Sequence, residues 1–195
     1  MSVASPTRTT TVRIAPMRRR HLRAVLRTEA QVYPRPWTLG LYLGELALPE
    51  EQRIYLVARS GGEVVGHAGL MFATTDGHVT TIAVDPSWQR RGIGAHLLLV
   101  LAREAIAKGA QDLTLEVRAS NHGAQAMYRR FGFHDAGVRH GYYQEDGEDA
   151  LIMWANDVAQ PAYAERLAGL EAEIARPGLV VVDDVHDGVR IGARR

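Results

Sequence analysis

The chain has 195 residues, of which 46% are hydrophobic and 23% are charged, and its formal net charge is +1 at pH 7. This composition is typical of one soluble globular domain with extensions, and no apolar run approaches the roughly 18 residues of a membrane span. The near-neutral charge favours no class of partner, and the absence of cysteine excludes disulfides, thiolate metal sites and a cysteine nucleophile.

The N-terminal region is rich in arginine, since seven arginines precede the first acidic residue, Glu29. Such a start is compatible with a mitochondrial transit peptide, or with a basic surface for nucleic acid or the ribosome. The alternation of Val12-Arg13-Ile14 is typical of a strand and favours a third interpretation. In that interpretation, residues 1–10 form a short disordered tail that leads into the folded domain.

The first half of the chain predicts a strand, two helices and an antiparallel meander. A strand at 11–14 precedes a helix at 17–32, and Thr38 caps a second helix at 39–48 after two prolines. Strands follow at 53–59, 64–73 and 78–84, with turns at Ser60-Gly61-Gly62-Glu63 and Asp76-Gly77.

The second half predicts alternating helices and strands, and then a change of pattern. A helix at 95–108 ends at Gly109, a strand spans 112–117, and Ser120 or Asn121 caps a helix that ends at residue 130. Strands at 133–140 and 150–154 flank a polar loop. We therefore expect a domain over 11–155 and a C-terminal appendage over 156–195, with an amphipathic helix at 163–175 and a short strand at 179–182.

The segment Gln89-Arg90-Arg91-Gly92-Ile93-Gly94-Ala95 lies between a strand pattern and a helix pattern. Free N–H groups at a helix start bind anions, its two glycines allow close approach to the backbone, and its two arginines add charge. No Lys-Ser or Lys-Thr follows, as a Walker A loop requires, and Leu97 replaces the third glycine of a dinucleotide fingerprint. The segment predicts a cradle for another pyrophosphate, or else a simple turn before a core helix.

Two motifs in this order resemble the GNAT superfamily of N-acetyltransferases. The cradle resembles the Q-x-x-G-x-G/A loop that binds the pyrophosphate of coenzyme A, and Tyr128-Arg129-Arg130-Phe131-Gly132-Phe133 resembles the Y-x-x-x-G-F segment. The resemblance covers about residues 11–155. It implies an α+β fold whose mixed, mostly antiparallel sheet splays between the fourth and fifth strands, with acetyl-CoA in the splay as the acetyl donor.

Three further segments resemble the RimI family of ribosomal-protein-alanine N-acetyltransferases, which acetylate the α-amino group of a protein N-terminus. They are Ile82-Ala83-Val84-Asp85-Pro86, Leu115-Glu116-Val117-Arg118-Ala119-Ser120-Asn121, and Tyr142-Tyr143 followed by Glu148-Asp149-Ala150 with Met153. The resemblance implies that the acceptor is a protein or peptide N-terminus, such as that of a ribosomal protein.

The resemblance also assigns roles to individual residues. Glu116 would be the proton acceptor and Tyr128 the proton donor. The cofactor would contact the strand edge Ile82-Ala83-Val84, the cradle residues Arg90, Arg91, Gly92, Ile93, Gly94 and Ala95, and Asn121. The acceptor groove would be lined by Trp37, Tyr142 and Tyr143. The alternatives are a surface pair with Arg118 for Glu116, and packing in the core for the aromatic residues.

The chemistry of transfer to an amine fits this assignment. A peptide α-ammonium group has a pKa of about 8, so its deprotonation near neutral pH needs only modest help. We expect burial at the sheet opening to raise the pKa of Glu116 toward the range of an effective base. Because the chain has no cysteine, direct transfer in a ternary complex is the natural route.

Several features leave the acceptor open. Ala95 stands where relatives commonly have arginine, and the appendage helix is expected to cover the acceptor groove, to form a dimer contact or to pack on the sheet. An enzyme that acetylates a small amine or a protein lysine is an alternative, and the acidic residues at positions 145, 146, 148 and 149 favour a cationic small amine. A non-catalytic acetyl-CoA-binding module is an alternative of another class.

The remaining expectations concern metal, location and assembly. The eight histidines have no metal-ligand spacing, so we expect no metal. We expect a cytoplasmic monomer or dimer without a DNA or membrane partner.

Overall fold

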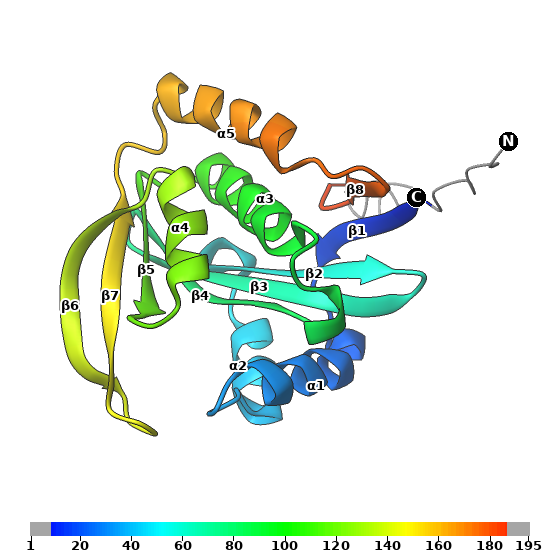
Figure 1. The fold of residues 1–195 in the computed structure, drawn as a ribbon, viewed down its shortest axis with the longest axis horizontal. Coiled ribbons are helices and arrows are strands. Elements are labelled where there is room, and N and C mark those ends of the chain that lie inside the picture. The colour runs from blue at the N-terminus through cyan, green and yellow to red at the C-terminus, as the bar shows by residue number, and fades with distance from the viewer. Residues whose placement is uncertain (1–8, 187–195) are drawn as a thin grey trace, which may run out of the picture.

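The computed structural model describes residues 9–186, which form one eight-stranded sheet with helices on both faces (Figure 1). In chain order the elements of the first half are β1 (Thr10–Pro16), a 3₁₀ turn (Arg19–His21), α1 (Leu22–Val32), α2 (Leu39–Ala47), β2 (Arg53–Ser60), β3 (Glu63–Ala73) and β4 (Asp76–Val84). Those of the second half are α3 (Ile93–Ala107), β5 (Asp112–Arg118), α4 (His122–Arg130), β6 (His134–Tyr143), β7 (Glu148–Ala155), α5 (Pro161–Ile174) and β8 (Leu179–Asp183). Short 3₁₀ turns precede β2 (Glu50–Gln52) and follow β4 (Pro86–Trp88).

The strand order is β6-β7-β5-β4-β3-β2-β1-β8. The meander from β1 to β4 is antiparallel, and so are the β5–β7 and β6–β7 pairs. Within residues 9–186, the parallel pairs are β4–β5 and β1–β8. The expectation of an α+β fold with a mixed, mostly antiparallel sheet is confirmed.

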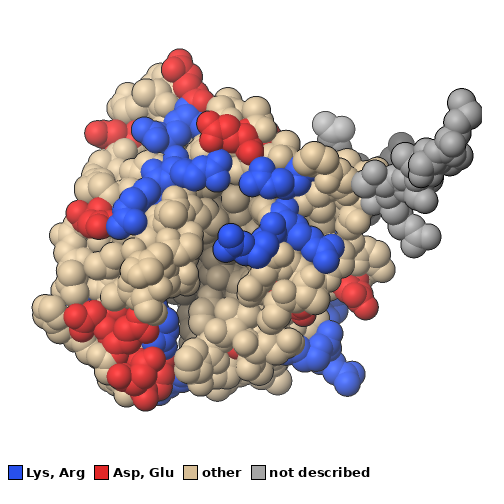
Figure 2. Space-filling view, viewed as in Figure 1, with Lys and Arg blue, Asp and Glu red and all other residues tan. Residues whose placement is uncertain are grey.

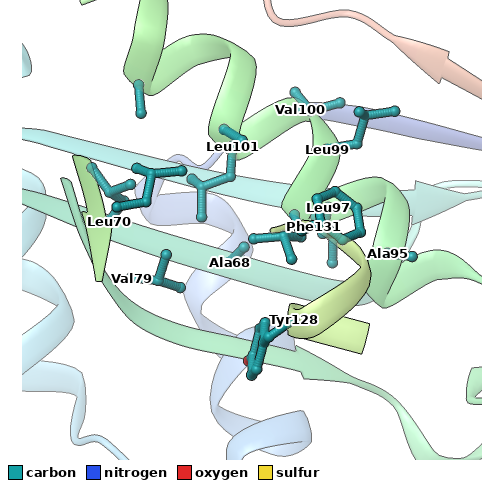
Figure 3. Close-up of a cluster of buried hydrophobic side chains, with 14 of the residues drawn as sticks. Ala68, Leu70, Val79, Ala95, Leu97, Leu99, Val100, Leu101, Tyr128 and Phe131 are labelled. Atoms are coloured by element: carbon teal, nitrogen blue, oxygen red, sulfur yellow. The ribbon is translucent and has the colours of Figure 1, made fainter. Parts of the chain in front are cut away.

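Alternating side chains of the strands divide the interior into two hydrophobic clusters. In β2, Leu56 packs with the cluster under α3, whereas Val57 packs with the cluster under α1 and α2. This alternation follows from the two-residue period of a strand. Figure 3 shows Leu97 and Leu101 of α3 above the strand that carries Ala68 and Leu70, and all four side chains are fully buried. The packing fixes α3, and therefore its N-terminal end, on the sheet.

The C-terminal appendage packs on the domain through both of its elements. The helix α5 lies over α3 (Figure 1), and its buried residues Leu167, Leu170 and Ile174 join the larger hydrophobic cluster. The strand β8 extends the sheet by pairing in parallel with β1, from Thr10↔Leu179 to Ile14↔Asp183. The expectation that this helix packs on the sheet is wrong in its partner, because α5 packs on α3, which itself covers the sheet.

Several sequence-based boundaries differ from the structure. The strands expected at 133–140 and 150–154 span His134–Tyr143 and Glu148–Ala155, and the tail expected over 1–10 overlaps β1 at Thr10, while residues 1–8 lie outside the described residues.

Two further differences have a clear physical cause. Asp76 and Gly77 do not form a turn but begin β4, because they pair with β3 on one side and with β5 on the other. The turn lies just before them, where Thr74 takes a positive φ of 61°. The first helix starts at Leu22, because the preceding Met17 extends the sheet contact of β1 by donating its N–H to the carbonyl oxygen of Tyr55. Among the helices of residues 9–186, none is long and apolar enough to cross a membrane.

A buried carboxylate ties α1 and α2 to the sheet. Glu29 of α1 is 1% exposed, and its Oε1 accepts hydrogen bonds from Tyr42 Oη at 2.9 Å and from His67 Nε2 at 2.8 Å. Its Oε2 accepts from the Trp37 N–H at 2.9 Å. Burial by itself raises the pKa of Glu29, but the hydrogen bonds from His67, Trp37 and Tyr42 outweigh burial and leave this pKa below its ordinary value. The ionised carboxylate therefore holds the loop between α1 and α2 in place.

We predict that Glu29→Ala lowers the free energy of unfolding by about 3 kcal/mol, because it leaves buried polar partners without their acceptor. Chemical denaturation of the variant and the parent protein measures this difference. The matched control is Glu165→Ala on the exposed face of α5, for which we expect a change within about 0.5 kcal/mol. Equal stability of the two variants would contradict a structural role for Glu29.

Candidate functional site

The sheet opens between β4 and β5. These strands pair in parallel over only three residue pairs, from Asp76↔Asp112 to His78↔Thr114. Directly beyond this point the register between β3 and β4 shifts, because Gly69 pairs with Thr81 while the next residue, Leu70, pairs with Val79. A bulge of this kind bends a strand and increases its local twist. The facing edges of residues 79–84 and 115–118 therefore diverge.

A cavity of about 1080 Å³ occupies this opening, and the hollow is visible at the centre of Figure 2. Its volume is at the upper end of the range for ligand pockets, about 300–1,000 Å³. The residues of the sequence-based assignment that line it are Trp37, Ile82, Ala83, Val84, Arg90, Gly92, Ile93, Gly94, Ala95, Glu116, Asn121, Tyr128, Tyr142 and Tyr143. One cavity thus brings together the cradle, both residues assigned to proton transfer and the aromatic residues of the acceptor side.

The cradle forms one end of the cavity. Gly92 is the N-cap of α3 and takes a left-handed conformation with φ of 88°, which glycine adopts without strain. No side chain caps this helix end. The first N–H groups of α3 therefore remain available to an anion, and the helix dipole adds favourable charge.

The remaining residues assigned to the cofactor differ in their surroundings. Arg91 does not line the cavity, because its guanidinium stacks over the ring of Trp88 at 4.7 Å and donates to the carbonyl oxygen of Ser87. Asn121 is the N-cap of α4, where its Oδ1 accepts from the Ala124 N–H at 3.1 Å. The Asn121 amide group therefore keeps its N–H donors for a ligand.

The β4 edge has a defined set of hydrogen-bond partners on the cavity side. Tyr33 Oη donates to the carbonyl oxygen of Ile82 at 2.8 Å, and Gln89 Nε2 donates to the carbonyl oxygen of Val84 at 3.1 Å. Ala83, between them, pairs with β3. Because backbone polar groups alternate in direction along a strand, the N–H groups of Ile82 and Val84 also point toward the opening. They are the donors that this edge offers to a ligand.

Glu116 lines the cavity from β5. Its side chain is 8% exposed and contacts His78 Nε2 through Oε2 at 3.1 Å and Arg139 Nη1 through Oε1 at 3.1 Å. The hydrogen bond from His78 and the charges of His78 and Arg139 outweigh burial and lower the pKa of Glu116. The expectation that burial raises this pKa is therefore wrong. The alternative pairing with Arg118 is wrong as well, since Arg118 binds carboxylates of the β6–β7 hairpin.

Tyr128 reaches the same cavity from α4. Its ring packs on Phe133 with centroids 5.8 Å apart, and the residue is 8% exposed. Figure 3 shows its hydroxyl end directed away from the apolar side chains of α3. Burial raises the pKa of Tyr128 well above its ordinary value. The hydroxyl group is therefore protonated at neutral pH and can donate a hydrogen bond.

The opposite end of the cavity is formed by the loop after α1 and by the β6–β7 hairpin. Trp37 packs on Tyr42 at a centroid distance of 5.2 Å, while Tyr142 and Tyr143 lie edge to face at 5.1 Å. The Arg118 guanidinium lies 3.9 Å from the centre of the Tyr143 ring. The hairpin carboxylates that bind Arg118 are Glu145, Asp146 and Glu148. This end is therefore aromatic and acidic, in contrast to the basic cradle end.

The sequence analysis did not identify several residues that line the cavity or contact Glu116. His78 and Arg139 contact Glu116, and Tyr33 and Arg176 line the cavity. They come from four separate segments, so no local motif joins them, and only their position in the fold identifies them. Within residues 9–186, no group of three or more His, Asp or Glu residues is arranged to hold a metal ion.

Comparison with known proteins agrees with this geometry. The sequence model of the acetyltransferase (GNAT) family matches residues 22–133. The chain is 37% identical over 138 residues to a putative [ribosomal protein bS18]-alanine N-acetyltransferase of Bacillus subtilis, covering 71% of this chain and 91% of that protein. It is 41% identical over 131 residues to the N-alpha-acetyltransferase RimI of Mycobacterium tuberculosis, covering 64% and 80%.

A solved structure shows the same arrangement of elements. The ribosomal-protein-alanine N-acetyltransferase of Escherichia coli matches with a TM-score of 0.68 and 32% identity, over 75% of this chain and 94% of that one. The splayed sheet, the glycine cradle at the start of α3 and the agreement in sequence lead to one conclusion. The chain belongs to the acetyltransferase (GNAT) family, and its similarity to RimI enzymes extends over most of its folded part.

Proposed function

We propose that this protein transfers the acetyl group of acetyl-CoA to the α-amino group of a protein N-terminus, such as that of a ribosomal protein. The observation that carries the proposal is the single cavity in which the phosphate cradle, Glu116 and Tyr128 meet. Enzymes of the GNAT family use acetyl-CoA, and the relatives named above are N-terminal acetyltransferases. An acceptor on the ribosome would place the activity in the cytoplasm.

The residues of the cavity fit acetyl-CoA. The uncapped start of α3 offers N–H groups to a pyrophosphate, and the β4 edge offers the N–H groups of Ile82 and Val84 to the amide groups of a pantetheine arm. When bound, acetyl-CoA supplies a thioester whose carbonyl carbon accepts the amine and whose sulfur leaves as a thiolate. The absence of cysteine is consistent with direct transfer while both substrates are bound.

Glu116 accepts the proton of the amine in this proposal. Its lowered pKa keeps the carboxylate ionised, so it binds and orients the α-ammonium group of the acceptor. An ammonium nitrogen has no lone pair, so the acceptor would react as the neutral amine, after one proton has passed to solvent. A low pKa makes Glu116 a poor base for a free ammonium group, but the protons that remain on nitrogen would become much more acidic as the new C–N bond forms. The carboxylate can accept a proton at that stage, and His78, in contact with Glu116, gives the proton a route toward solvent.

Tyr128 is the proton donor in this proposal. Its hydroxyl group keeps its proton at neutral pH because burial raises its pKa, and Tyr128 lines the same cavity as the cradle and Glu116. A donor here stabilises the negative charge that develops on the leaving sulfur.

The acceptor end suits a chain terminus with positive charge. Trp37, Tyr142 and Tyr143 offer apolar walls for the first side chains of a peptide. The hairpin carboxylates add negative charge, and Glu145 lines the cavity directly. This acidic character also favours a second candidate, a small cationic amine such as a polyamine.

We predict that the purified protein, given acetyl-CoA, acetylates free N-termini in a peptide library varied at the first residue, with the highest rate for alanine or another small residue. A lysine peptide with a blocked N-terminus and a polyamine serve as parallel acceptors, and mass spectrometry locates the added acetyl group. Acetylation of the lysine or polyamine alone would overturn the proposed acceptor and leave the cofactor unchanged.

We predict that Glu116→Gln and Tyr128→Phe each lower kcat by roughly 10²-fold or more while the Kd of acetyl-CoA stays within about twofold. Steady-state kinetics and calorimetric titration measure the two quantities. Tyr163→Phe is the matched control, because Tyr163 is buried outside the cavity and its hydroxyl group has no hydrogen-bond partner among the described residues. If both site variants keep the parent rate, the assignment of acceptor and donor is wrong.

We predict that kcat/KM for a peptide acceptor rises with pH through an inflection at about pH 8, the pKa of a free α-ammonium group, and levels off above it. The lowered pKa of Glu116 keeps that carboxylate ionised over the whole neutral range, so it contributes no inflection there. A pH profile from about pH 5 to 9.5 tests this for the parent and for Glu116→Gln, which should share the inflection at different plateaus. An inflection between about pH 5 and 7 that disappears in the variant would contradict it.

A further inference from the structure

The appendage helix α5 is fixed against the two helices that border the cavity. Arg103 of α3 donates from both terminal nitrogens to the Glu171 carboxylate, at 3.1 and 2.8 Å. Arg130 of α4 donates to Glu173 at 3.0 Å. Ile174, the last residue of α5, is 1% exposed. Two ion pairs and a buried apolar face therefore fix the C-terminal end of α5 in place against α3 and α4.

The end of α5 lies against the cradle. A Cβ atom on Gly92 would lie 3.3 Å from the carbonyl oxygen of Ile174 and 3.7 Å from Cγ of Arg176. Ile174 and Arg176 both line the cavity. The appendage therefore contacts the glycine at which α3 begins and contributes an arginine to the cavity wall.

Arg176 is held by its side chain and by the strand that follows it. Its Nη1 donates to the carbonyl oxygens of Glu173 at 3.1 Å and Ala175 at 3.2 Å, which anchors the guanidinium to the end of α5. Three residues later β8 begins, and Leu179 pairs with Thr10 of β1. A side chain between two fixed elements loses little further freedom on binding a ligand.

The guanidinium of Arg176 still has donors to offer. The bonds to the two carbonyl oxygens use Nη1 and leave the N–H groups of Nε and Nη2. Within residues 9–186, no carboxylate forms an ion pair with Arg176, whereas Arg130 is paired with Glu173 and Arg118 with the hairpin. Arg176 therefore presents two donor nitrogens at the cavity wall, and no carboxylate of residues 9–186 neutralises its guanidinium group.

The surroundings of Arg176 favour an anion. The start of α3 presents uncapped N–H groups beside it, and Arg90, two residues before Gly92, lines the same cavity. Figure 2 shows basic side chains along one rim of the hollow and acidic side chains on the other side. These groups converge on a ligand with several negative charges.

We propose that Arg176 is part of the cofactor site and binds a phosphate group of acetyl-CoA, so that the appendage completes the cradle. The inference rests on the proposed function, because it takes acetyl-CoA as the donor. Coenzyme A carries a pyrophosphate and a 3′-phosphate, and both present the same chemistry to a guanidinium group. Arg176 makes this contact from a segment that follows the acetyltransferase (GNAT) match at residues 22–133.

The test compares the parent protein with Arg176→Gln by calorimetric titration with coenzyme A and with dephospho-coenzyme A, which lacks the 3′-phosphate. We expect the variant to bind coenzyme A about 10-fold more weakly, with Arg176→Lys in between because it keeps the charge but not the forked donors. A loss with both ligands assigns the contact to the pyrophosphate. A loss with coenzyme A alone assigns it to the 3′-phosphate.

The matched control is Arg166→Gln. It removes one arginine charge, as Arg176→Gln does, but from a position on α5 that does not line the cavity. We expect unchanged affinity for this variant, and an equal loss in both variants would show a non-specific charge effect and contradict the proposal. Unchanged affinity of Arg176→Gln for both ligands would also overturn it. Arg176 is exposed, so we expect the thermal midpoints of the free variants to match the parent. Failure of the parent protein to bind coenzyme A would instead count against the proposed function.

Discussion

The site depends on the early end of the β4–β5 pairing. Two strands that separate after three residue pairs leave backbone groups without their ladder partners, and such groups are costly when buried. Side chains replace part of the missing ladder. Gln125, which is 4% exposed, donates to the carbonyl oxygens of Arg118 and Ala119, and Tyr33 donates to that of Ile82. The opening persists because these contacts satisfy the diverging edges while leaving N–H donors of β4 to the cavity.

The two ends of the cavity are stabilised in different ways. The cradle end is fixed by apolar packing of α3 against the sheet and by α5 above it, so its geometry follows from the hydrophobic core. The acceptor end is made of a loop and a hairpin, which polar contacts hold in place. Glu29 binds the Trp37 backbone, and Arg118 binds three hairpin carboxylates. In the proposed function, the cradle fixed by the core would hold the cofactor, and the loop and the hairpin would contact the acceptor.

Local patterns in the sequence predicted the parts of the site that depend on neighbouring residues. The glycine at the start of α3, the Asn121 cap and the order of strands and helices all follow from turn and capping chemistry. The pKa of Glu116 could not be predicted in this way, because its sign is set by His78 and Arg139, which come from other strands. The turn assigned to Asp76-Gly77 failed for the same reason, since pairing with two neighbouring strands outweighed a local preference. The place of the appendage depended equally on long-range contacts.

Charge is distributed along the cavity in the order that a ternary complex requires. In the proposed function, the basic cradle end would attract a donor with several phosphates and the acidic hairpin end a cationic amine, so the two substrates would be drawn to opposite ends. Glu116 lies between them with its charge preserved by His78 and Arg139 rather than lost to burial. In the proposed function, an ionised carboxylate at this position would attract the ammonium group before it accepts a proton. If Glu116 has the proposed role, substrate selection and proton transfer rest on the same side chain, and a lowered pKa serves the first of these tasks better than a raised one.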